Sequence, residues 1–118
     1  MARLTVIIPV YNEENTIKKI IDKVKKVKLP NISKEIIVVD DCSTDNTKNI
    51  LRKIKSMSLN IFYHKKNKGK GAAIKTGFQH ATGNIILIQD ADLEYNPNEY
   101  GKLLSPIINN KTKVVYGS

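Results

Sequence analysis

The chain alternates between short apolar runs and amphipathic segments along almost its whole length. Residues 85–88 are Ile-Ile-Leu-Ile, a run with the length and branching typical of a strand buried on both faces. Further apolar runs lie at 4–10, 35–39, 59–64 and 112–116. Between the runs, apolar residues recur at helical spacing, for example at Ile17, Ile20, Ile21, Val24 and Val27. The alternation predicts an α/β fold with a mostly parallel sheet flanked by helices.

The length of 118 residues suits one domain with a single core, so we expect residues 1–118 to form one domain. No apolar run approaches the roughly 20 residues that a membrane span needs, and the N-terminus has no signal-peptide layout. The single cysteine, Cys42, excludes an internal disulfide and fits a reducing compartment. We therefore expect a cytoplasmic protein whose contact with a membrane is at most peripheral.

Acidic residues are concentrated directly after the predicted strands. Eight of the eleven acidic residues occupy such places: Glu13, Glu14, Asp40, Asp41, Asp45, Asp90, Asp92 and Glu94. The carboxyl ends of parallel strands line one edge of a sheet, which is the usual ligand crevice. A chain of net charge +9 has thus gathered its negative charge at one rim. A metal, hydrogen bonds or lysines must relieve the repulsion there.

Asp90 and Asp92 follow the apolar run at 85–88. Two carboxylates spaced i, i+2 project to the same side while the chain stays extended. They remain ionised most easily with a cation between them, and Mg²⁺ and Mn²⁺ favour such oxygen ligands together with substrate phosphates. We interpret the pair as a metal and diphosphate site. The alternative is that both residues only cap the next turn or helix.

A lysine-rich loop precedes a predicted helix at about 71–81. Its lysines surround a Gly69–Lys70–Gly71 turn, where free N–H groups and the helix dipole would suit phosphate. The spacing is not that of a P-loop, and a solvated surface is the alternative. Upstream, Asn12 is expected to cap the first helix. His64 and His80 have no motif around them and are expected to be structural or surface residues.

Four segments together resemble a known family: IPVYNEE (8–14), VVDDCSTDNT (38–47), NKGKGAA (67–73) and DADLEYNP (90–97). In this order they resemble the donor-binding half of family 2 glycosyltransferases with the GT-A fold. The polyprenyl-phosphate sugar synthases are the most similar branch. The resemblance implies transfer of a sugar from a UDP- or GDP-sugar, with inversion, to an acceptor such as a polyprenyl phosphate.

The resemblance also implies roles for single residues in binding the nucleotide-sugar. Pro9, Tyr11 and Glu13 would frame the nucleotide, and Asp40 would hydrogen-bond the base. Lys70 would contact phosphate.

The metal site would come from the segment DADLEYNP. Asp90 and Asp92 would form a DxD pair that binds Mg²⁺ or Mn²⁺, and Ala91 would add a backbone contact to the nucleotide-sugar. Asp92 would be the catalytic member, joined to the diphosphate through the metal. Glu94 stands where some relatives carry Gln.

Family members are normally much longer than this chain. The resemblance therefore leads us to expect the donor-binding part of a catalytic domain without its acceptor half. Such a part should bind nucleotide weakly, transfer sugar poorly and self-associate through exposed apolar surface.

Two readings from other functional classes remain open. A phosphoacceptor receiver domain also uses an acidic pair and a lysine, but its pair should follow the first strand, where this chain has Val10–Tyr11–Asn12. A nucleic-acid-binding module is suggested only by the charge. Its basic segments lack interleaved aromatics, so we expect no nucleic-acid partner.

Overall fold

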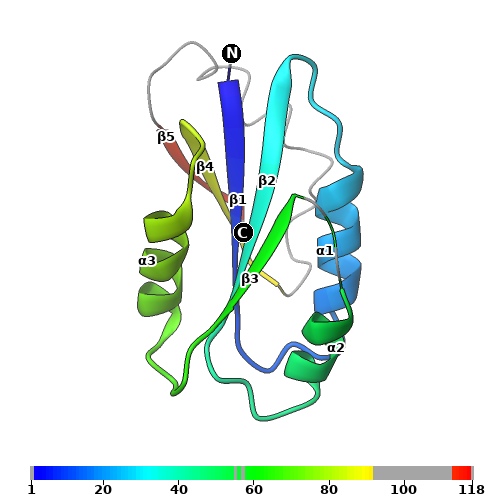
Figure 1. Ribbon diagram of the computed structural model, residues 1–118, viewed down its shortest axis with the longest axis vertical. Coiled ribbons are helices and arrows are strands. Elements are labelled where there is room, and N and C mark those ends of the chain that lie inside the picture. Colours follow the sequence, from blue (N-terminus) through cyan, green and yellow to red (C-terminus); the bar gives the residue numbers. More distant parts are fainter. Residues whose placement is uncertain (1, 55, 57, 92–112, 118) are drawn as a thin grey trace.

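A computed structural model describes residues 2–54, 56, 58–91 and 113–117. In it, five strands form one sheet in the order β3-β2-β1-β4-β5, and every pairing is parallel (Figure 1). The strands are β1 (Ala2–Val10), β2 (Ile32–Asp40), β3 (Leu59–Tyr63), β4 (Ile85–Gln89) and β5 (Lys113–Gly117). The helices are α1 (Ile17–Lys26), α2 (Thr47–Lys53) and α3 (Lys70–His80). The predicted parallel α/β fold is confirmed.

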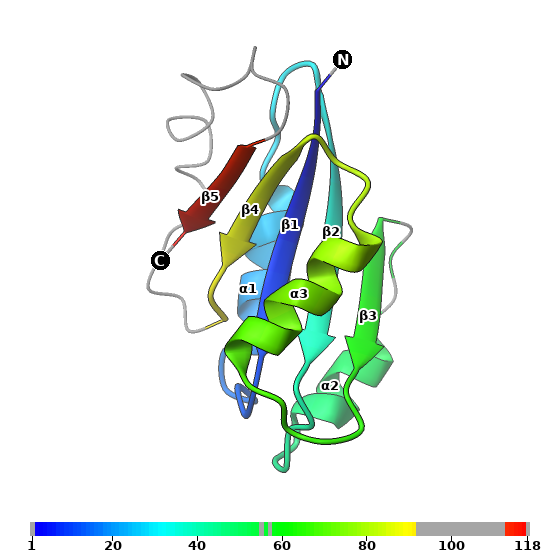
Figure 2. The ribbon, with the colours of Figure 1, turned by 90° about the vertical axis from the view of Figure 1, so that its left-hand side faces the viewer.

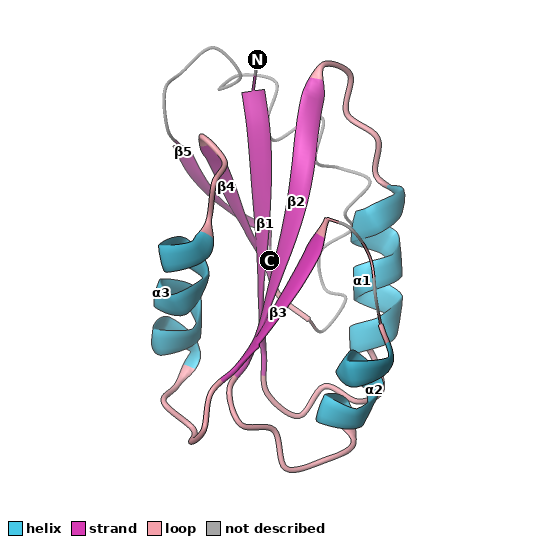
Figure 3. Cartoon of the chain, viewed as in Figure 1, coloured by secondary structure: helices cyan, strands magenta, loops and turns pink. Residues whose placement is uncertain are grey.

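The helices cover both faces of the sheet. Helices α1 and α2 lie on one face and α3 lies on the other, as Figures 2 and 3 show. Because successive residues of a strand point to opposite faces, β1 contributes to both layers. Leu4, Val6 and Ile8 pack in the cluster that includes the buried residues of α1, whereas Ile7 packs with Ile74 of α3. The central strand is thus buried on both sides, as its apolar run predicts.

Helix α1 buries the predicted apolar stripe but starts later than expected. Ile17, Ile20, Ile21 and Val24 are buried, and lysines occupy its outer face. Asn12 is not the N-cap; that position belongs to Thr16. Asn12 instead has a positive φ of 52°, a left-handed conformation that asparagine tolerates better than most residues. The prediction of an Asn12 cap was wrong because a cross-loop contact, described below, holds this residue.

Two glycines allow close approach between α3, the turn after it, and β1. A Cβ atom on Gly77 would lie 2.5 Å from Ile7 Cγ2, so glycine at this position lets the helix pack closely on the strand. A Cβ atom on Gly83 would lie 2.7 Å from the carbonyl oxygen of Arg3.

The order of the strands reverses between β1 and β4. Strands β1, β2 and β3 follow one another toward one edge of the sheet, and α3 then leads back to β4 on the other side of β1. Such a switch point is where ligands bind in open parallel sheets.

A buried carboxylate, Glu35, accepts hydrogen bonds from neighbouring segments toward the amino-terminal end of the sheet, away from the carboxyl ends of the strands. Glu35 is only 5% exposed, and its Oε2 accepts hydrogen bonds from Thr5 Oγ1 (2.6 Å), Thr82 N (2.6 Å) and Thr82 Oγ1 (2.7 Å). The Nη2 atom of Arg3 lies 3.6 Å from Glu35 Oε1. Burial works to raise the pKa of Glu35, but the hydrogen bonds from Thr5 and Thr82 and the charge of Arg3 outweigh it, so the pKa is lowered.

We expect Glu35→Gln to reduce the free energy of unfolding by about 1–2 kcal/mol at pH 7, because a charged acceptor of several bonds is lost. Since folding lowers this pKa, the carboxylate contributes its stability above the unfolded-state value of about 4.3 and loses it as pH falls through the folded value. The difference between wild type and variant should therefore shrink below about pH 4. Unfolding in guanidinium chloride at several pH values measures this difference in the free energy of unfolding. Glu14→Gln, on an exposed side chain, is the control, and a pH-independent difference would contradict the assignment.

No helix among the described residues is long and apolar enough to cross a membrane.

Candidate functional site

A cavity of about 140 Å³ opens at the carboxyl ends of β1 and β2, beside the start of α3. It is lined by residues 9–11 and Glu13 at the end of β1 and just beyond it, by Asp41 just after β2, and by Lys70 and Ala73 from the first turn of α3. Tyr11 is 45% exposed here. Pairing of β1 with β4 ends at Ile7, two residues before Pro9, so the missing N–H of Pro9 interrupts no pairing with β4. The cavity lies at the predicted edge of the sheet.

Hydrogen bonds join two loops at this edge of the sheet. Asn12 Oδ1 accepts bonds from the backbone N–H groups of Thr44 (2.7 Å) and Asp45 (3.2 Å), and Asn12 N donates to Ser43 Oγ (2.9 Å). The loop after β1 is therefore fastened to the loop after β2. The positive φ of Asn12 is held in place by these bonds.

The two adjacent aspartates after β2 have different environments. Asp40 is fully buried, and its two carboxylate oxygens accept bonds from Ser43 Oγ (2.5 Å) and Ser43 N (3.1 Å). Among the described residues, Asp41 lines the cavity and Asp40 does not. Asp40 thus shapes the loop, whereas Asp41, which is 3% exposed, belongs to the lining of the cavity.

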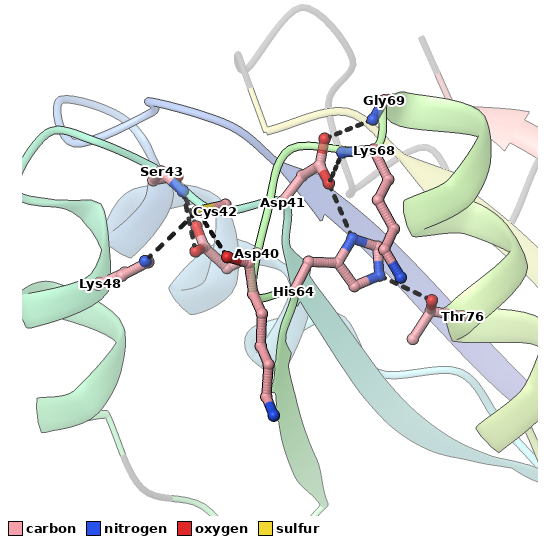
Figure 4. Close-up of polar contacts among 10 residues, drawn as sticks. Asp40, Asp41, Cys42, Ser43, Lys48, His64, Lys68, Gly69 and Thr76 are labelled. Carbon is pink, nitrogen blue, oxygen red and sulfur yellow. Dashed lines mark hydrogen bonds and ion pairs between the residues drawn. The ribbon is translucent and has the colours of Figure 1, made fainter.

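Asp41 lies at the centre of a network that Figure 4 shows in close-up. Its Oδ1 accepts bonds from His64 Nδ1 (2.8 Å) and Lys68 N (2.9 Å), and its Oδ2 accepts one from Gly69 N (2.8 Å). The other ring nitrogen of His64 lies 2.8 Å from Thr76 Oγ1 on α3. Burial works to raise the pKa of Asp41, but these hydrogen bonds and the nearby imidazole outweigh it and lower the pKa. The carboxylate therefore stays ionised at neutral pH.

This network changes the interpretation of the glycine turn before α3. The sequence suggested that free N–H groups there would bind phosphate. In the structure, the N–H groups of Lys68 and Gly69 bind Asp41, and α3 begins one residue later, at Lys70. Gly69 adopts a φ of 97°, which a residue with a side chain rarely accepts. The turn therefore positions Asp41, and Lys70 remains the residue of the turn that lines the cavity.

Asp90 follows β4 and forms an ion pair with Lys70. The Nζ atom of Lys70 lies 2.5 Å from Asp90 Oδ1, and the Lys70 side chain is 60% exposed. The carbonyl oxygen of Ala91 accepts a bond from Thr16 Oγ1 (2.6 Å), so the N-terminus of α1 holds the turn after Asp90. Asp92 and Glu94 lie outside the described residues.

Of the two carboxylates expected to bind the metal, Asp90 and Asp92, only Asp90 is among the described residues. No group of three or more His, Cys, Asp or Glu side chains gathers within the described part of the chain. A carboxylate is nevertheless a hard oxygen ligand that suits Mg²⁺ or Mn²⁺, and these ions need only one or two carboxylates when substrate phosphates complete the coordination. The residues present therefore fit such a metal.

The structure brings together most of the predicted site residues it describes. Pro9, Tyr11, Glu13 and Lys70 line one cavity, and Lys70 reaches Asp90. Asp40 is buried behind the cavity wall, and Ala91 is buried with its carbonyl engaged by Thr16. Asp41 was expected only as one of the acids at this rim, with no role of its own, and His64 was expected to be a structural or surface residue. The signal for Asp41 was its place just after a predicted strand, next to Asp40.

The chain is similar to known proteins along almost its whole length. The family model described as "Glycosyl transferase family 2" matches residues 5–118. A dolichyl-phosphate beta-glucosyltransferase (ALG5D) of Trichomonas vaginalis is 36% identical over 124 residues, which cover 95% of this chain and 38% of the relative.

Two solved structures share the fold. Staphylococcus aureus TarS 1-349 in complex with UDP-GlcNAc has a TM-score of 0.76 and 31% identity, over 91% of this chain and 31% of that one. The mannosyltransferase PcManGT from Pyrobaculum calidifontis, in complex with GDP-Man and Mn²⁺, has a TM-score of 0.74 and 33% identity, over 83% of this chain and 30% of that one. The chain thus spans about a third of the length of these proteins.

Proposed function

The chain belongs to glycosyltransferase family 2 and has the GT-A fold, and from that premise we propose that it binds the nucleoside diphosphate sugar from which a sugar is transferred to an acceptor. The observation that carries the proposal is the cavity at the carboxyl ends of β1 and β2, with an aromatic ring, an ionised carboxylate and a lysine on its wall. UDP-GlcNAc and GDP-Man in the two similar structures support a nucleotide-sugar as ligand.

The lining residues suit the parts of such a donor. Tyr11 offers an exposed ring face to a base, and the Asp41 carboxylate, which can only accept hydrogen bonds, suits a base N–H donor. Lys70 is a cation at the N-terminus of α3, where negative charge is favoured, so it suits the diphosphate. Asp90 would hold Mg²⁺ or Mn²⁺, with Asp92 as its expected second ligand. That metal would neutralise charge on the departing nucleoside diphosphate.

The acceptor we propose is a polyprenyl phosphate, and the transfer inverts the anomeric carbon. The name of the Trichomonas relative, a dolichyl-phosphate glucosyltransferase, supports this choice. A phosphate oxygen of such an acceptor is already ionised at neutral pH, so attack on the sugar needs no general base.

A thermal-shift screen tests the proposal. UDP, GDP, dTDP and their sugars are each added with and without Mn²⁺. We expect one nucleoside diphosphate to raise the melting temperature by several degrees with Mn²⁺, because ligand at about 100 times its Kd stabilises by about 2.7 kcal/mol. A DNA oligonucleotide is the control for binding driven only by the net charge of +9. A melting temperature that no nucleotide raises would contradict donor binding.

A further inference from the structure

His64 is one of the polar side chains near the cavity that the proposed donor contacts leave without a role. It follows β3, and its side chain is 9% exposed. Both ring nitrogens have partners, Asp41 on one side and Thr76 on the other, so the ring is held from β2 and from α3 at once (Figure 4). Its backbone N–H also donates to the carbonyl oxygen of Asp40 (2.8 Å). The position of the imidazole is therefore closely determined.

The tautomer of the ring follows from its partners. An ionised carboxylate can only accept, so Nδ1 must carry the hydrogen that it donates to Asp41. In the neutral ring Nε2 then accepts from the hydroxyl of Thr76. Thr76 thus fixes the orientation of the ring, with Nδ1 directed to Asp41, as outer partners of a histidine commonly do.

The hydrogen bonds on Asp41 are divided unequally between its two oxygens. Oδ1 accepts two bonds, from His64 and from Lys68 N, whereas within the described residues Oδ2 accepts only the bond from Gly69 N. A carboxylate oxygen has two lone-pair sites, so Oδ2 keeps one for a ligand in the cavity that Asp41 lines. Loss of the His64 bond would leave Oδ1 with the bond from Lys68 N alone and let the carboxylate rotate more easily.

We propose that His64 is a positioning residue for recognition of the nucleotide base: with Thr76 behind it, His64 holds the Asp41 carboxylate so that one oxygen faces the cavity. This inference rests on the proposed function and adds to it a residue that acts through Asp41. The ligand feature it selects is a base N–H donor, as in a uracil or guanine imide. In the proposed function the diphosphate is bound by a different residue, Lys70, which lies on α3 and pairs with Asp90.

The test compares a ligand that has a base with one that lacks it. The affinities of UDP or GDP, whichever the wild type binds, and of pyrophosphate are measured by calorimetry with Mn²⁺. We expect His64→Leu to weaken the nucleotide about tenfold and pyrophosphate less than twofold, because one charge-assisted hydrogen bond is lost. His64→Asn should recover most of the affinity, since its amide N–H can replace Nδ1–H. His80→Leu, which changes the histidine stacked on Phe62, should alter neither affinity.

A second variant keeps the test decisive even where His64→Leu does not fold. Thr76→Val removes the partner of Nε2 and should weaken the nucleotide about threefold without affecting pyrophosphate. Equal losses for nucleotide and pyrophosphate in folded variants, or no recovery in His64→Asn, would overturn the role of His64 alone. A wild-type chain that binds pyrophosphate but no nucleotide, or neither ligand, would overturn the proposed function and this inference with it.

Discussion

Replacing Asp41 with asparagine should weaken binding of the nucleoside diphosphate between tenfold and a hundredfold. The carboxylate accepts three hydrogen bonds within the protein, two at Oδ1 and one at Oδ2. An amide has one acceptor oxygen, so its NH₂ group must face an N–H donor at one of these places. A buried donor left without an acceptor costs about 1–3 kcal/mol, and rotation of the side chain would also remove the oxygen that, in our proposal, faces the cavity. Calorimetric titration with Mn²⁺ present measures the loss.

Asp40→Asn is the matched control, since it makes the same change one residue earlier. Among the described residues, the Asp40 carboxylate bonds only Ser43, and an amide can satisfy both contacts because the Ser43 hydroxyl can turn and accept. We expect its nucleotide affinity to stay within about threefold and its free energy of unfolding to fall by about 1 kcal/mol. A folded Asp40→Asn chain with the larger loss of affinity would return the base contact to Asp40, where the sequence analysis put it.

The assignment of these two aspartates shows where reasoning from sequence ends. Apolar runs predicted the strands because burial on both faces leaves a continuous apolar signature. The signature does not say which side chain faces a cavity after the strand has ended. The chain leaves β2 at Asp40 and turns at Cys42, whose φ is 63°, so the alternation of a strand no longer applies to Asp41.

Residues whose partners are distant in sequence were also missed. Asn12 had the local pattern of a helix cap, but its contacts with the loop after β2 determine its conformation. His64 had no motif, because its partners Asp41 and Thr76 lie 23 and 12 residues away. Likewise β2 begins at Ile32, earlier than its apolar run, because pairing with Ala2–Leu4 extends it. In each case a tertiary contact overrides a local preference.

Replacing Asp90 with alanine should remove the part of nucleotide binding that depends on the metal. With Mn²⁺ present, we expect the affinity for the nucleoside diphosphate to fall about a hundredfold, or ~2.7 kcal/mol. The reason is that, in our proposal, the protein holds the metal through only two carboxylates, Asp90 and Asp92, so that one of the two is lost. Without Mn²⁺ the affinity should not fall, because the variant also removes a negative charge near the phosphates and releases Lys70.

Titration of the nucleotide with and without Mn²⁺, for wild type and variant, separates these two effects. Asp22→Ala on α1 removes the same charge from a helix outside the cavity lining and should change either affinity less than twofold. Lys70→Met should behave differently from both, weakening the nucleotide with or without Mn²⁺ because its ammonium contacts phosphate in our proposal. If Asp90→Ala keeps the full enhancement by Mn²⁺, the metal is bound by other groups. Asp92→Asn then becomes the deciding variant, because a DxD pair binds through both of its carboxylates.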